Sequence, residues 1–202
     1  MSDLTALPYD ITPEAFFKVI VETVSGQPLP DNARPERAQI SLDGDGGGTW
    51  NCGFSDGQFT IEPGSCAGCP VHVALSVDDW REFVAGRLRD SVKEHVDVAL
   101  IDPQALVKLY GTAEKIEQVN ALKGSLRVTI EDDSRHYVAT LATGGADPVS
   151  DEPTATVAMT LENFGLLASG QENPQMAFFS GKIRVDGDLN HVMGLFALTM
   201  TS

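Results

Sequence analysis

The spacing of hydrophobic residues changes from strand-like to helix-like at two places in this chain. Over residues 71–76, apolar and polar side chains alternate, as expected for a half-buried strand. Over residues 77–86, the apolar side chains recur three and four positions apart, as expected for a helix with one buried face. The pattern predicts a strand that leads directly into a helix.

The same pattern recurs 84 positions later. The segment VAMTLENF at 157–164 aligns with VALSVDDW at 73–80. Ser76 and Thr160 occupy equivalent positions, where a helix favours an N-cap hydroxyl. Gly86 and Gly170 share this offset and are expected to end the helices in the left-handed conformation. The sequence therefore predicts a duplicated strand-and-helix unit.

Each copy follows a predicted hairpin. Alternation predicts one hairpin over 38–54, a third strand over 59–61, and a second hairpin over 126–141. An amphipathic helix is predicted over 13–24, and the proline-rich segment 25–36 is predicted to be a connecting loop.

Further elements are predicted after each copy. Residues 183–187 read as a last strand and residues 189–196 as a closing helix. Residues 107–119 follow the same order after the first copy, and an additional helix is predicted over 92–100. These repeats divide the chain into units at 1–122 and 123–202, and the short join between them favours one pseudo-symmetric body.

Composition excludes some classes of function. The chain has 202 residues, 14 Lys and Arg against 29 Asp and Glu, and a net charge of −15, which repels nucleic acid. It has no apolar run long enough to span a membrane and begins without a basic or hydrophobic leader, so we expect a cytoplasmic protein. The three cysteines are then expected to be reduced thiols.

The segment Asn173-Pro174-Gln175-Met176-Ala177-Phe178-Phe179-Ser180-Gly181-Lys182-Ile183, with the turn at Gly187, resembles the sterol carrier protein type two family. This resemblance implies an α+β fold with a mostly antiparallel sheet and helices packed on one face. Applied to both copies, it gives two pseudo-repeated sterol-carrier-like units. It also implies an apolar tunnel between sheet and helices for sterols, fatty acids or acyl-CoA. No catalytic residues and no cofactor come with it.

We therefore predict a non-enzymatic protein that binds or carries a hydrophobic small molecule. The alternative is a structural module with filled cavities that mediates assembly, because apolar residues at these spacings are also typical of an ordinary core. The predicted ligand-binding residues are all apolar side chains of the second copy: Met159, Phe164, Leu167, Met176, Phe178, Phe179, Ile183, Val185, Val192, Met193 and Phe196.

Cys66 and Cys69 form a C-x-x-C motif, and Cys52 and His72 lie nearby in the sequence. These are residue types of a zinc site or of a redox pair. Strand alternation places Cys52 on the core face of its strand and His72 on the face opposite Val71 and Val73, so the two are not expected to share one site. We therefore predict no metal and interpret the motif as a tight turn. Cys66 and Cys69 remain the metal or redox candidates.

Other motifs indicate no catalytic site. His95, His136 and His191 have no nucleophile or carboxylate at a recognisable spacing. Residues 43–48, DGDGGG, suit a hairpin turn better than a calcium or phosphate loop. The helix over 13–24 has two Glu and one Lys, which argues against membrane docking, and a homo-oligomer is left open.

Overall fold

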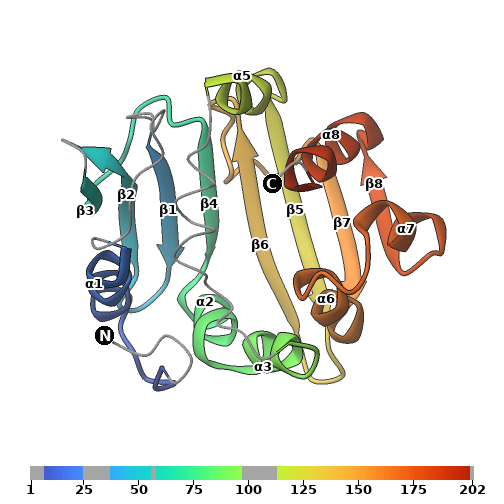
Figure 1. Cartoon of the computed structure of the whole chain (residues 1–202), viewed down its shortest axis with the longest axis horizontal. Coiled ribbons are helices and arrows are strands. Elements are labelled where there is room, and N and C mark those ends of the chain that lie inside the picture. The colour runs from blue at the N-terminus through green and yellow to red at the C-terminus, as the bar shows by residue number, and fades with distance from the viewer. Residues whose placement is uncertain (1–6, 25–36, 56–57, 97–112, 201–202) are drawn as a thin grey trace.

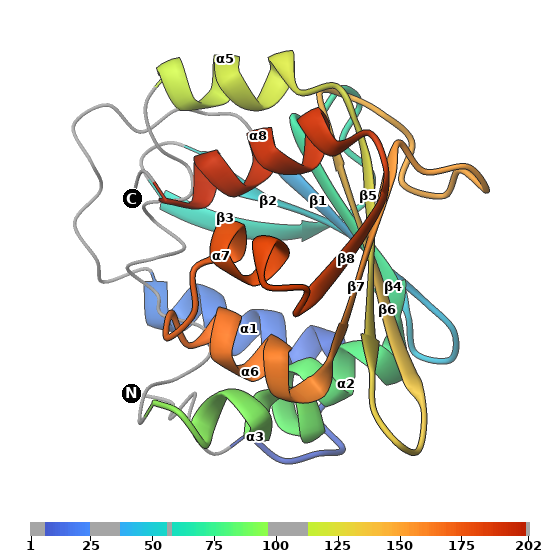
Figure 2. The ribbon, with the colours of Figure 1, turned by 90° about the vertical axis from the view of Figure 1, so that its right-hand side faces the viewer.

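The computed structural model describes residues 7–24, 37–55, 58–96 and 113–200. It contains one continuous sheet of eight strands with the helices on one face (Figures 1 and 2). The strands are β1 (Ala38–Asp43), β2 (Gly48–Ser55), β3 (Gln58–Pro63), β4 (Val71–Ser76), β5 (Gly124–Glu131), β6 (His136–Thr143), β7 (Ala155–Thr160) and β8 (Ile183–Gly187).

The helices come in the order expected from the sequence, with α7 (Pro174–Phe179) as an addition in the segment that was expected to be a turn. They are α1 (Pro13–Val24), α2 (Val77–Ala85), α3 (Arg87–Lys93), α5 (Ala113–Ala121), α6 (Leu161–Ala168), α7 (Pro174–Phe179) and α8 (Leu189–Met200). Among the described residues, five of the seven strand pairings are antiparallel, and the other two, β1 with β4 and β5 with β7, are parallel. The predicted α+β class is confirmed.

Strand registers repeat between the two halves. In the first half Ala38 of β1 pairs with Val71 of β4, and Asp43 pairs with Ser76. In the second half β5 pairs with β7 in the same way, from Leu126 opposite Ala155 to Glu131 opposite Thr160. The partners on β4 and β7 are again 84 positions apart, so the two aligned segments occupy matching places in the sheet. That the chain is a tandem duplication stays a prediction.

The two halves join through β4 and β6. The strand order is β3-β2-β1-β4-β6-β5-β7-β8. In the second half, β8 lies antiparallel to β7 on the side away from β5. In the first half, β6 takes the corresponding place beside β4. A strand of the second half therefore completes the sheet of the first.

Helix caps follow the predicted positions. Ser76 accepts a hydrogen bond from the Asp79 N–H at 2.9 Å, and Thr160 accepts one from the Asn163 N–H at 3.3 Å. Gly170 has a positive φ of 74°, as predicted. The prediction for Gly86 is wrong because its φ is −123° and it leads directly into α3. A Cβ at Gly86 would lie 2.9 Å from the Glu82 Cα, so close packing explains this glycine instead.

The helix predicted over 92–100 begins earlier and is shorter. It is α3, which ends at Lys93, and Ala99 and Leu100 lie outside the described residues. The loop predicted at 25–36 and the strand predicted at 107–111 also lie outside them. The predicted boundary at 122/123 falls between α5 and β5, and the division into two units there stays a prediction.

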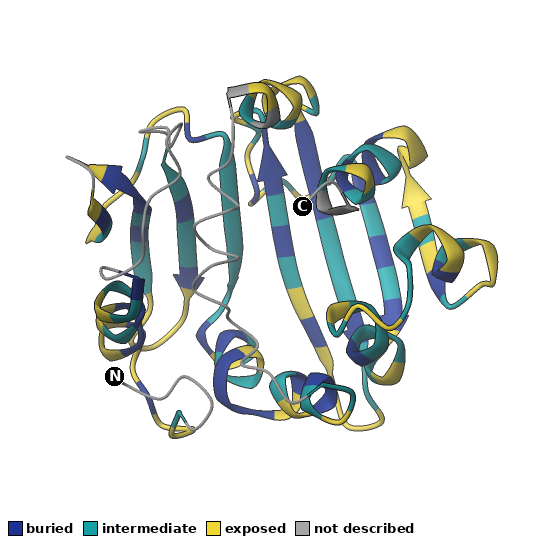
Figure 3. Cartoon of the chain, viewed as in Figure 1, coloured by how far each residue is buried: buried dark blue, intermediate teal, exposed yellow. Residues whose placement is uncertain are grey.

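Two hydrophobic clusters lie between the sheet and its helices (Figure 3). The first is formed by α1, α2 and the strands β1 to β3, and includes Trp50 and Trp80. The second is formed mainly by β5, β7, β8 and the helices from α6 onward, and includes Val157 and Val192. Each repeat thus contributes a core to the same side of the sheet.

Candidate functional site

An apolar cavity of about 290 Å³ lies in the first half, between the sheet and helices α1 and α2. Strand alternation directs every second side chain of β1 to β4 toward these helices, which accounts for the lining from the sheet. None of the described residues that line the cavity carries a charge. The lining consists of Phe16, Phe17, Ile20, Ile40, Cys52, Phe59, Ile61, Val73, Leu75, Trp80, Phe83, Val84 and Ala139.

Aromatic pairs form much of the cavity wall. Phe16 of α1 meets Trp80 of α2 edge to face, with ring centroids 5.4 Å apart. Phe17 packs against Trp50 of β2 at 4.9 Å. The Phe16–Trp80 contact sets the separation between α1 and α2, and the Phe17–Trp50 contact sets the separation between α1 and the sheet. The same contacts limit how far smaller side chains between them can close the remaining space.

A hydrogen bond ties the segment before α1 to α2. The Tyr9 hydroxyl donates to Glu82 Oε1 at 2.7 Å. This hydrogen bond to a carboxylate raises the pKa of Tyr9, and burial adds to the effect. Tyr9 is therefore a neutral donor at physiological pH, and the contact helps to hold α1 and α2 on either side of the cavity.

The cavity includes a residue of the second repeat. Ala139 lies on β6 and pairs with Leu75 of β4, which also lines the cavity. Its methyl group leaves room that a larger side chain at this position would occupy. The site therefore depends on β6 taking the place beside β4.

The structure places most of the predicted ligand-binding residues in or against the second core. Met159, Ile183 and Val192 are buried members, and five others pack against them: Phe164, Leu167, Phe178, Val185 and Phe196. Met193 is half-buried. Met176 and Phe179 of α7 point to solvent, with 59% and 77% of their surfaces exposed. A ligand site at these residues stays a prediction.

The first-half cavity residues were predicted as core positions of helices and strands, but not as a ligand site. Hydrophobic spacing identifies which side chains face inward. It does not report whether the inward-facing side chains fill the space they enclose, because that depends on the separation of helices and sheet. The sequence therefore lacked the signal that distinguishes this cavity from a filled core.

A groove of about 340 Å³ is lined by α1, β2 and β3 and shares part of its lining with the cavity. Phe17 and Ile61 line both. The charged residues of the groove are Glu14, Lys18 and Glu22, all on α1. The surroundings of the cavity on this side thus carry two carboxylates and one ammonium group.

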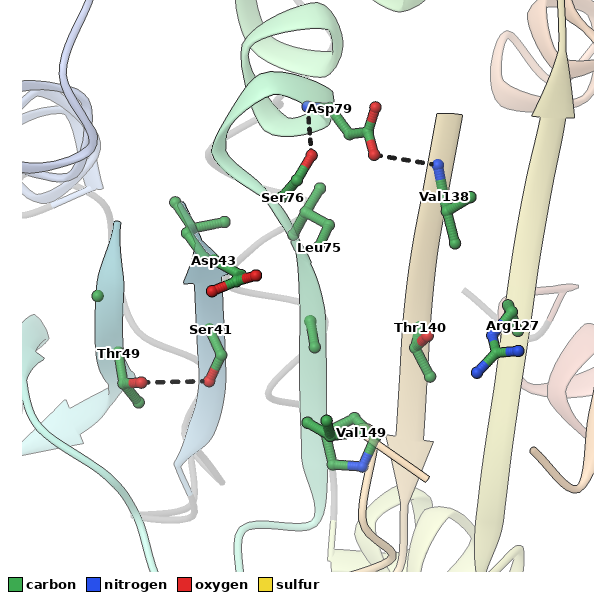
Figure 4. A pocket seen from close by; sticks show the side chains of 14 residues that line it. Ser41, Asp43, Thr49, Leu75, Ser76, Asp79, Arg127, Val138, Thr140 and Val149 are labelled. Carbon is green, nitrogen blue, oxygen red and sulfur yellow. Dashed lines mark hydrogen bonds between the residues drawn. The ribbon is translucent and has the colours of Figure 1, made fainter. Parts of the chain in front are cut away.

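A different hollow, an open trough of about 880 Å³, lies on the sheet face without helices (Figure 4). Ala74 of β4 pairs with Ser41 of β1 on one side and with Thr140 of β6 on the other, and the β6–β7 loop contributes Val149. Asp43, Asp79 and Arg127 also line it. Because hydroxyls and charges line this trough, it is less suited to an apolar guest than the cavity under the helices.

The C-x-x-C motif contains a disulfide between Cys66 and Cys69. The prediction that all three thiols are reduced is therefore wrong for these two. Only Cys52 is a thiol, buried in the first core. Within the described residues, no cluster of three His, Cys, Asp or Glu could hold a metal ion. The disulfide also removes both thiolates as metal ligands in this state.

Comparison with models of protein families matches one family over part of the chain. Residues 104–199 match the model of the SCP-2 sterol transfer family. This SCP2-like segment covers the second half of the sheet, and among its described residues Ala139 alone lines the cavity. It also contains the Asn173 to Ile183 stretch on which the resemblance was based.

Solved structures of sterol carrier proteins are similar to parts of the chain. Sterol carrier protein 2 like 2 from Aedes aegypti is 19% identical, with a TM-score of 0.32 over 42% of this chain and 92% of that chain. Sterol carrier protein 2 from Yarrowia lipolytica, in its apo form, is 16% identical, with a TM-score of 0.34 over 55% and 83%. A palmitated form of the Aedes aegypti protein is 19% identical, with a TM-score of 0.34 over 58% and 91%. No curated protein sequence matches the chain.

Helices long and apolar enough to cross a bilayer are absent from the part of the chain that the structure describes.

Proposed function

We propose that this protein binds a hydrophobic small molecule, such as a fatty acid, sterol or related lipid, and carries it without catalysing a reaction. The observation that supports this most directly is the cavity under α1 and α2, whose described lining residues are all apolar. A guest in such a site is held by removal of its apolar surface from water. The sterol transfer family of the SCP2-like segment points to the same class of ligand.

The volume of the cavity favours a slender guest. A dry apolar cavity of about 150 Å³ accommodates one benzene molecule. By that measure the 290 Å³ here corresponds to roughly twelve carbon atoms. A twelve-carbon acyl chain is therefore the first ligand to test, and a rigid sterol would need the walls to move apart.

The test is to fill the cavity and measure binding. Val73 lies on β4 in the cavity floor, and Val73→Phe would place a ring in the space of the ligand. Native mass spectrometry of the full chain with dodecanoic acid should show a one-to-one complex for the unmodified protein. We expect at least a roughly tenfold loss of affinity in Val73→Phe. The new ring would keep part of the acyl chain out of the cavity, and the burial lost in this way is worth more than about 1.4 kcal/mol of binding free energy.

A matched control uses the same substitution on the opposite face. Val149 is 74% exposed in the β6–β7 loop, so Val149→Phe adds the same ring away from the cavity. It should leave dodecanoic acid binding unchanged. Unaltered binding in Val73→Phe would exclude the first-half cavity as the site.

The second repeat is the other candidate location, because the family match covers it. Val185 of β8 packs against the second core and belongs to the predicted ligand-binding set. If Val185→Phe loses binding while Val73→Phe retains it, the ligand lies in the second half, as the sequence predicted.

A role in assembly is the competing function. The observation that favours it is the exposure of Met176 and Phe179 on α7, since large exposed apolar side chains are typical of contact surfaces. This role predicts a stable oligomer that Phe179→Ser converts to a monomer, with no binding of dodecanoic acid or cholesterol by either form.

A further inference from the structure

The β3–β4 loop contains a disulfide that closes only a short ring. Cys66 and Cys69 are three positions apart, and Gly68 between them has a φ of +73°, which a tight turn of this kind requires. The stabilisation from a disulfide increases with the length of the loop it closes. This one constrains so few residues that support of the fold is a poor explanation for it.

The two sulfur-bearing residues differ in access. Cys66 is half-buried, whereas Cys69 is buried with 7% of its surface exposed. Thiol–disulfide exchange requires an attacking thiolate to reach one sulfur and expel the other. The arrangement offers Cys66 for attack and makes Cys69 the leaving group.

Hydrogen bonds connect the disulfide loop to the open trough. The Cys66 N–H donates to Gln39 Oε1 at 2.7 Å. This contact fixes the orientation of the amide, whose Nε2 then donates to His72 Nε2 at 3.0 Å. The same ring nitrogen lies 2.8 Å from the Ser41 Oγ in the wall of the trough. These hydrogen bonds link the disulfide loop to His72 and Ser41.

We infer that Cys66–Cys69 is a redox-active site that a dithiol reductant reduces reversibly. A reductant thiolate attacks the Cys66 Sγ, a new S–S bond forms, and Cys69 leaves as a thiolate that takes up a proton. The second thiolate of the reductant attacks its own sulfur in the mixed disulfide and releases Cys66, which is protonated in turn. Two electrons and two protons pass from the dithiol, which becomes a disulfide, to the two cysteines.

The experiment uses the full chain without denaturant, with dithiothreitol as the dithiol probe and oxidised glutathione as the reverse oxidant. Alkylation and intact mass should count two additional reactive thiols after reduction, and re-oxidation should remove both. The half-buried position of Cys66 should make Cys69→Ser form a mixed disulfide with glutathione roughly tenfold faster than Cys66→Ser. Equal rates would overturn the assigned direction of attack.

A spectroscopic measurement on the unmodified sequence needs no variant. The imidazole resonances of His72 should shift between the oxidised and reduced chain, while those of His191, in the other half, should not. A disulfide that dithiothreitol reduces only in denaturant would overturn the inference, and so would two thiols that oxidised glutathione never joins. Neither outcome bears on ligand binding in the cavity.

Discussion

The His191 imidazole is buried near the start of α8, with 5% of the residue exposed. Its Nε2 has no hydrogen-bond partner in the described part of the chain. Its ring lies beside Gly124, where an added Cβ would come within 2.9 Å of Cε1. Burial lowers the pKa of His191, and the negative charge of Asp188 opposes this only in part.

The lowered pKa predicts a loss of stability in mild acid. The unfolded chain binds the proton at its ordinary pKa of 6.5, whereas the folded chain resists it. The free energy of unfolding should therefore be unaffected by this group above pH 6.5. Below pH 6.5 it should decrease as the pH falls, by at most about 1.4 kcal/mol per pH unit from this group. Urea unfolding at pH 7.5 and 5.5 measures this.

His191→Gln supplies the comparison, because a neutral amide cannot take up the proton. The variant should lose less stability than the unmodified protein between the two pH values. His72, whose pKa is also lowered by burial, is unchanged in this variant, so its contribution cancels. Equal losses in both proteins would contradict the assignment to His191.

The two N-cap hydroxyls allow a second prediction at single residues. Ser76 and Thr160 occupy equivalent positions in the repeats and accept equivalent backbone N–H groups. Ser76→Ala and Thr160→Ala should each lower the free energy of unfolding by about 1 kcal/mol, because an orphan donor loses its acceptor. Chemical denaturation of both variants measures the loss. Ser76→Asp should retain most of the stability, and a loss as large as that of Ser76→Ala would contradict a capping role.

At the scale of elements, the repeat allows the same substitution to be made in two environments. Val73 on β4 and Val157 on β7 are 84 positions apart and both face the helices. Val73 borders the cavity, whereas Val157 is buried with 2% exposure in the second core. We expect Val157→Phe to destabilise the protein by about 1–3 kcal/mol through overpacking.

Val73→Phe should cost much less, because the added ring enters existing space instead of displacing neighbours. Thermal unfolding of both variants, without ligand, measures the difference. A melting temperature of Val73→Phe as low as that of Val157→Phe would show that the first-half space is already occupied by its own side chains.

Most secondary structure could be predicted because it depends on local spacing. The alternation in 71–76, the apolar stripe of α1 and the hydroxyl caps each act within a few residues. The cavity could not be located in this way. Hydrophobic spacing predicts that the helices over 13–24 and 77–86 each bury one face. The separation of these helices from each other and from the sheet is set by contacts between remote segments, such as Phe16 with Trp80 and Phe17 with Trp50.

The state of the Cys66–Cys69 motif and the pairing of β4 with β6, which joins the two halves, also could not be predicted from local spacing. C-x-x-C spacing allows a disulfide, a metal site or a reduced turn, so the sequence left these open. The position of β6 beside β4 follows from which strand fills the free edge of the first half. Any strand with a similar alternation of apolar and polar residues could pair with the free edge of β4, and spacing alone does not choose between such strands.

At the scale of the whole molecule, the shared sheet predicts that both halves unfold together. The register between β4 and β6 runs from Val71 opposite Thr143 to Leu75 opposite Ala139, so neither half can lose its strands without exposing the edge of the other. The two tryptophans, Trp50 and Trp80, both lie in the first half and report on it alone. Far-UV circular dichroism reports on the helices and strands of both.

Tryptophan fluorescence and circular dichroism should therefore give coincident urea unfolding curves with one midpoint, because a two-state transition looks the same to every probe. Val192→Ala, which removes buried methyl groups from the second core, provides the strict form of the test. Val192→Ala should lower the fluorescence and dichroism midpoints equally, although the substitution is in the second half and both tryptophans are in the first. A midpoint by fluorescence that stays fixed while the dichroism midpoint falls would show that the continuous sheet does not couple the two repeats.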